Sequence, residues 1–173
     1  GWYFLEILNL SHNKLTGEIF QESSNFTYIF MLFMDNNQFT GKIGQGLKSM
    51  RNLGLLDISN NNLTGVIPSW IAELPLNTLF ISNNLLEGEI PSSMFNKFSV
   101  LDLSSNNLSG NIPPQVKKIP SMLFLQDNHL SGTIPDILLA NVQVLDLRNN
   151  RFSGNIPQFF NPETITTLLL RGN

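Results

Sequence analysis

Few side chains in this sequence have the types and spacing that catalysis requires. The two histidines, His12 and His129, lie far apart, and the acidic residues Glu87 and Glu89 have no third group nearby to complete an acid–base site. No set of histidines and acidic residues has metal-ligand spacing, and the chain contains no cysteine. We therefore expect no enzymatic activity, no metal and no cofactor.

The polar residue that does recur is asparagine, and its expected chemistry is structural. An amide both donates and accepts hydrogen bonds, so it can satisfy backbone groups that a tight bend would otherwise leave buried and unpaired. The asparagines recur every 22 to 24 residues, which is the period of a solenoid. We predict that they stack as a structural ladder along the array: Asn13, Asn37, Asn61, Asn84, Asn106, Asn128, Asn150 and Asn173.

A repeated phrase surrounds each asparagine and predicts the element that positions it. The phrase reads LDLSSNNLSGNIP at 101–113, with close copies at 56–68 and 145–157. Its Leu-x-Leu alternation predicts a short strand with one buried face. The glycine suits positive φ, and the proline should end any strand pairing. Stacked coils would align the strands about 4.8 Å apart in a parallel sheet.

The predicted fold class is therefore a leucine-rich repeat solenoid, a curved right-handed coil with a parallel β-sheet on its concave face. The return segments on the convex side are too short for stable helices, so we expect single turns of 3₁₀ or helix there. Each should point one apolar residue inward: Ile71, Met94, Val116 and Leu138.

Residues 1–173 are expected to form a single array of about eight repeats, the last one partial, without terminal caps. Uncapped ends would expose core, so self-association through them is expected. The net charge is −3 and no lysine or arginine run occurs, which argues against nucleic acid as a partner. The longest near-apolar run, 26–34, is far short of a membrane span, so any anchor would lie outside this sequence.

The phrase LxLSxNxLSGxIP resembles the plant-specific class of extracellular leucine-rich repeats, found in receptor-like kinases, receptor-like proteins and polygalacturonase-inhibiting proteins. The wording at 34–47 and 138–157 is most similar to receptor-like proteins of the disease-resistance type. The resemblance implies an extracellular ectodomain at the plasma membrane that binds a peptide or protein and signals through a co-receptor kinase in defence or development. The alternatives are a secreted inhibitor of a pathogen wall-degrading enzyme and a truncated product without function.

The residue between the two leucines of each strand points out from the concave face. From Phe33 onward, aromatic and acidic residues alternate at this position. We expect these residues, with Arg148, to bind the ligand: Phe33, Asp57, Phe80, Asp102, Phe124 and Asp146. Arg148 and Arg171 would meet a carboxylate of the ligand. The structural alternative is that aspartate simply belongs to the repeat and that each phenylalanine covers neighbouring leucines.

Four Asn-x-Ser/Thr sequons occur, at Asn9, Asn25, Asn62 and Asn107. We expect glycosylation at Asn25, Asn62 and Asn107. Asn25 lies in a return segment and is independent of the repeat phrase. Asn9 falls on the proposed binding face, where a glycan would block the end of the sheet, so we expect it to be unmodified.

Overall fold

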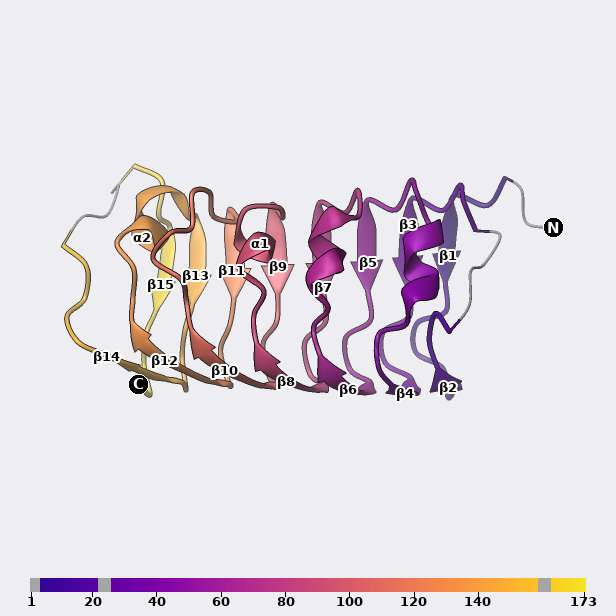
Figure 1. Ribbon diagram of the computed structural model, residues 1–173, viewed down its shortest axis with the longest axis horizontal. Coiled ribbons are helices and arrows are strands. Elements are labelled where there is room, and N and C mark those ends of the chain that lie inside the picture. The colour runs from indigo at the N-terminus through magenta and orange to yellow at the C-terminus, as the bar shows by residue number, and fades with distance from the viewer. Residues whose placement is uncertain (1–3, 22–25, 159–162) are drawn as a thin grey trace.

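The computed structural model describes residues 4–21, 26–158 and 163–173, and these form a solenoid of stacked coils (Figure 1). Its main sheet has eight parallel strands in sequence order. The leucines pair in repeat register, so that Leu8 lies opposite Leu32 and Leu32 opposite Leu56. The strands are β1 (Ile7–Asn9), β3 (Met31–Phe33), β5 (Leu55–Asp57), β7 (Thr78–Phe80), β9 (Val100–Asp102), β11 (Met122–Phe124), β13 (Val144–Asp146) and β15 (Thr167–Leu169).

A second parallel sheet of seven strands follows the bend after each asparagine, and sequence analysis did not predict it. Figure 1 shows these strands running obliquely along the lower side of the molecule. Their pairing is shifted by two residues per coil, since Ser109 lies opposite His129 and not opposite its repeat equivalent Ser131. The strands are β2 (Thr16–Glu18), β4 (Gln38–Gly41), β6 (Asn62–Val66), β8 (Leu85–Glu89), β10 (Asn107–Asn111), β12 (His129–Thr133) and β14 (Arg151–Ser153).

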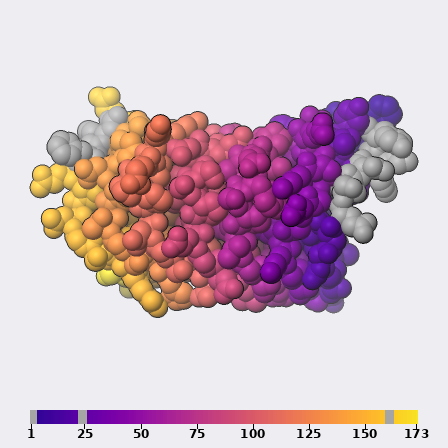
Figure 2. Space-filling view, in the orientation of Figure 1, coloured from indigo at the N-terminus to yellow at the C-terminus, as the bar shows by residue number. Residues whose placement is uncertain are grey.

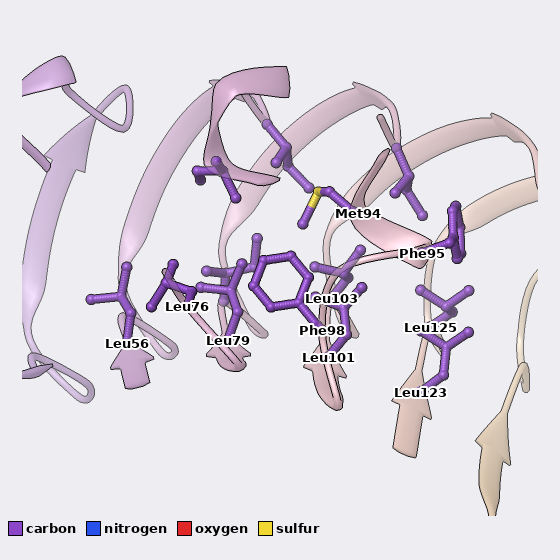
Figure 3. Packing of buried hydrophobic residues seen from close by; sticks show 14 of the residues in the cluster. Leu56, Leu76, Leu79, Met94, Phe95, Phe98, Leu101, Leu103, Leu123 and Leu125 are labelled. Atoms are coloured by element: carbon purple, nitrogen blue, oxygen red, sulfur yellow. The ribbon is translucent and has the colours of Figure 1, made fainter. Parts of the chain in front are cut away.

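The return segments are short, as predicted. They contain the 3₁₀ helices η1 (Gln45–Ser49) and η2 (Ser69–Glu73) and the single-turn helices α1 (Ser92–Phe95) and α2 (Ile137–Asn141). The predicted inward residues Ile71, Met94, Val116 and Leu138 are all buried. Figure 3 shows Met94 and Phe95 of α1 packing toward the row of strand leucines that includes Leu101 and Leu123. The coils follow one another as successive bands along the molecule (Figure 2).

The recurring asparagines connect the two sheets at the bend. The Nδ2 group of Asn84 donates to Ile81 O and Ser82 O of its own coil and to Ile58 O of the preceding coil. Its Oδ1 accepts the backbone N–H of Leu63, in β6 of the preceding coil, at 3.0 Å. One buried amide thus satisfies backbone groups of two coils and both sheets, which a leucine could not do.

Candidate functional site

The outward face of the main sheet carries three parallel rows of side chains. The first row precedes the central leucine of each strand and is mainly apolar: Ile7, Met31, Leu55, Thr78, Val100, Met122, Val144 and Thr167. The middle row follows that leucine: Asn9, Phe33, Asp57, Phe80, Asp102, Phe124, Asp146 and Leu169. The third row is polar: Ser11, Asp35, Ser59, Ser82, Ser104, Gln126, Arg148 and Arg171. We call this surface the concave face.

The three phenylalanines of the middle row are partly buried and partly exposed. Phe80 lies opposite Asp57 on one side and Asp102 on the other, and Phe124 lies opposite Asp102 and Asp146. At the strand spacing of a parallel sheet, phenylalanines two coils apart are about 10 Å from each other. The concave face therefore offers aromatic surface at regular intervals, with a carboxylate between each pair of neighbouring rings.

Two of the middle-row aspartates accept hydrogen bonds from the serine two residues later in the chain. Asp57 Oδ1 accepts hydrogen bonds from the backbone N–H and the hydroxyl of Ser59, at 3.0 and 2.5 Å. Asp102 makes the same pair of bonds with Ser104, at 3.0 and 2.6 Å. The Asp-x-Ser sequence of the repeat thus has a structural role at the end of the strand. The Oδ2 atom of each of these half-buried carboxylates accepts neither of the two hydrogen bonds from the serine.

Burial raises the pKa of the Asp57 carboxyl group, because the charged form loses water. The hydrogen bonds from Ser59 oppose this shift, while the negative charges of Asp35 and Asp102 add to it. The carboxylates along this part of the concave face therefore repel one another. A cation placed among them would relieve that repulsion.

Asp146 and Arg148, which were both expected to bind the ligand, pair with each other in the structure. Asp146 is 2% exposed, so it offers almost no surface to a ligand. Arg148 occupies the position of Ser59 and Ser104, and its Nε and Nη2 reach back to both Asp146 oxygens at 2.6 to 3.1 Å. The physical reason is the longer guanidinium, which pairs bidentately with the carboxylate two residues earlier.

The sequence-based prediction did not include the apolar first row, because it considered the residues between the leucines and the arginines that follow them. Ile7 and Met122 are 55% and 37% exposed. The sequence could have predicted this row, because the residue before the first leucine of each strand also points outward in the strand alternation. The concave face is therefore apolar where the strands start and polar where they end.

The sequons lie on different faces. Asn62 and Asn107 are exposed at the first positions of β6 and β10 in the second sheet, whereas Asn9 ends β1 on the concave face. The side-chain oxygen of Asn9 accepts a hydrogen bond from the backbone N–H of Ser11. Asn25 lies outside the described residues.

The described part of the chain contains no group of three or more histidine, cysteine or acidic residues that could hold a metal ion. Nε2 of His12 lies 3.7 Å from Oδ2 of Asp35. His129 is in β12, several coils away. Among the described helices, none has the length and apolar character needed to cross a membrane.

Comparison with known proteins identifies the repeat. The family model described as Leucine Rich Repeat matches residues 4–26, 52–74, 75–96, 97–119 and 141–162, which is more than half of the chain. Receptor-like protein 15 of Arabidopsis thaliana is 68% identical over 34 residues, which are 20% of this chain and 4% of that protein.

Two solved plant receptors have the same fold. The Arabidopsis receptor kinase HAESA, in complex with the peptide hormone IDA and the co-receptor SERK1, is 37% identical, with a TM-score of 0.74. That similarity covers 86% of this chain and 26% of the HAESA chain. The plant peptide hormone receptor RGFR1, in complex with RGF2, is 31% identical, with a TM-score of 0.82, over 95% of this chain and 28% of that one. The chain belongs to the leucine-rich repeat family, and its relatives include plant receptor-like proteins and receptor ectodomains.

Proposed function

We propose that this chain is the ligand-recognition segment of a plant cell-surface receptor-like protein. A peptide or protein ligand binds along the concave face, and the signal passes through a partner kinase in defence or development. The observation that carries this proposal is the row of partly exposed phenylalanines, Phe33, Phe80 and Phe124, alternating with aspartates across the strands of one continuous sheet. The structurally similar HAESA and RGFR1 were solved with peptide hormones bound.

The chemistry of the face favours a ligand with apolar and basic groups. Apolar first-row and aromatic middle-row residues would bury the ligand's apolar side chains, and Asp57 and Asp102 would attract its basic ones. Arg171 is exposed in the last coil, whereas Arg148 is already paired with Asp146. Arg171 is therefore the better candidate to meet a ligand carboxylate at that end.

The proposed location is the extracellular side of the plasma membrane, with the attachment supplied by a part of the protein beyond this sequence. Glycans at Asn62 and Asn107 would lie on the second sheet, because both residues begin strands of that sheet. They would leave the concave face open. A glycan at Asn9 would cover one end of it.

The test is a comparison of the glycosylated chain with a Phe80→Ser/Phe124→Ser double variant. Both would be immobilised and exposed to peptides and proteins of plant extracellular fluid and of pathogen cultures, and the retained molecules would be identified by mass spectrometry. We expect specific capture by the wild type and at least a tenfold loss in the double variant, since hot-spot aromatics typically contribute more than about 1.4 kcal/mol each.

The matched control is Val66→Ser/Leu85→Ser, which removes two exposed apolar residues of the second sheet. Equal retention by the wild type and the Phe80/Phe124 variant would contradict the proposed binding face. Capture of a wall-degrading enzyme together with loss of that enzyme's activity would instead support an inhibitor.

A further inference from the structure

Two exposed aromatic residues, Tyr28 and Phe30, precede β3 at the edge of the main sheet where its strands begin, and we call them the aromatic rim. Tyr28 and Phe30 are 54% and 52% exposed, although Ile29 between them is fully buried. Phe30 has coils on both sides, because its N–H donates to Glu6 O and its carbonyl accepts from Gly54 N. Its exposure is therefore not an effect of lying at an end of the array. Neighbouring exposed aromatic residues between packed coils are available to contact a ligand.

Gly54 in the next coil leaves room for the Phe30 ring. A Cβ atom at Gly54 would lie 2.6 Å from Cε2 of the Phe30 ring, so a larger residue would displace the ring. Gly54 is not among the glycines with positive φ. The position of the ring therefore requires this glycine, and the backbone conformation does not.

The rim is continuous with the apolar first row of the concave face. Met31 follows Phe30 directly and pairs in register with Ile7 and Leu55. Phe33 ends the same strand. Apolar residues thus follow the chain from the rim to the end of β3, where Met31 and Phe33 are partly exposed.

Carboxylates border this apolar surface where the strands end. Asp57 lies opposite Phe33, and Asp35 follows Phe33 by two residues. In an extended peptide, side chains two residues apart on one face are separated by about 7 Å, which equals the spacing of neighbouring rows on the sheet. A single extended ligand segment can therefore contact the first row and the acidic residues at the same time.

We propose that Tyr28, Phe30 and Met31 bind an aromatic or aliphatic side chain of the ligand, while Asp57 pairs with a lysine or arginine two residues away in the ligand. This subsite rests on the proposed function, since it assigns one region of the same face. The ligand is an extended peptide segment with the pattern apolar-x-basic, because the spacing from the first row, which contains Met31, to the row of Asp57 matches two residues of an extended chain and the carboxylate favours a basic group.

The probe is a phage-displayed library of short random peptides, selected on the full chain and sequenced. The wild type is expected to enrich aromatic-x-basic and aliphatic-x-basic peptides. Phe30→Ser should weaken binding of an enriched peptide roughly tenfold, and the variant should lose the apolar preference in a repeated selection. Gly54→Ala should do the same by displacing the ring, and it leaves the core untouched. Asp57→Asn should remove only the basic preference.

The control is Leu85→Ser, which removes an exposed leucine of the second sheet and should leave the selection unchanged. If Phe30→Ser and Gly54→Ala both enrich the wild-type peptides at wild-type affinity, the subsite is overturned. The proposed function would still stand in that case if Phe80→Ser/Phe124→Ser abolishes capture. If the wild-type chain enriches no peptide and captures no protein, both proposals fail.

Discussion

Single asparagine side chains hold the bend between the two sheets, and Asn84 is a clear example. It is 7% exposed, and its amide bonds to backbone groups of two coils. Replacement by leucine keeps the branching and the number of side-chain heavy atoms but leaves buried carbonyls and the Leu63 N–H without partners. We expect Asn84→Leu to lower the free energy of unfolding by about 3 kcal/mol, measured by chemical denaturation. Asn62→Leu, at an exposed position of β6, is the control and should change stability little.

Asp57 should make the stability of the array depend on pH. Burial raises the pKa of its carboxyl group above the ordinary value of 3.8, so the folded state binds this proton more tightly than the unfolded state. The favourable contribution is complete below pH 3.8 and is lost as the pH rises through the raised pKa. Compared with Asp57→Asn, the wild type should therefore become relatively less stable from acid toward neutral pH.

Denaturation curves for both proteins across that pH range would measure this difference. The asparagine oxygen can still accept the hydrogen bonds from Ser59, so the comparison isolates the charge. A difference that stays constant, or that favours the wild type as the pH rises, would contradict the assigned environment of Asp57.

At the scale of elements, the second sheet depends on its glycines. Gly110 has φ of +83°, a conformation that L side chains rarely adopt, and a Cβ there would lie 2.8 Å from Cγ of Glu89 in the preceding coil. We expect Gly110→Ala to destabilise the protein by about 1–2 kcal/mol in thermal or chemical unfolding. The double variant Glu89→Ala/Gly110→Ala should recover only the stability lost to the collision with Glu89, and not the stability lost to the positive φ. Full recovery would show that the backbone conformation contributes nothing.

The main sheet was predictable because Leu-x-Leu and the period of the repeat are local signals. The second sheet was not predicted, because the glycine and proline of the phrase indicate a turn and a strand end rather than pairing. Its strands pair with a shift of two residues per coil, as between Ser109 and His129, so the aligned repeats do not reveal which residues lie opposite each other.

The candidate site was predictable only in outline. The Leu-x-Leu pattern indicated that Phe80 and Phe124 face outward, but no sequence rule indicated that Arg148 would turn back onto Asp146. Phe30 and Gly54 occupy equivalent positions of neighbouring coils, so the period places them side by side, but it does not indicate that the ring lies over the glycine. Such contacts depend on side-chain packing across coils, which the period alone does not determine.

The molecule as a whole is a stack in which each coil covers its neighbours, so an end coil leaves core residues accessible. At the N-terminal end of the described array, a hollow of about 400 Å³ is lined mainly by apolar residues, including Leu8, Leu10, Leu15, Phe20 and Phe26. Water in contact with such a surface is unfavourable, and pairing with another copy would remove it. We therefore expect the isolated chain of 173 residues to self-associate.

Sedimentation velocity over a range of concentrations would measure this association. Leu15 lines the hollow and is 39% exposed, so Leu15→Glu should place a charge in the contact and shift the chain toward the monomer. Leu85→Glu introduces the same charge at a 58% exposed position in the middle of the second sheet and should leave the association unchanged. A wild-type profile that is monomeric at every concentration would contradict the prediction. An equal effect of the two substitutions would show that the contact between copies does not involve this hollow.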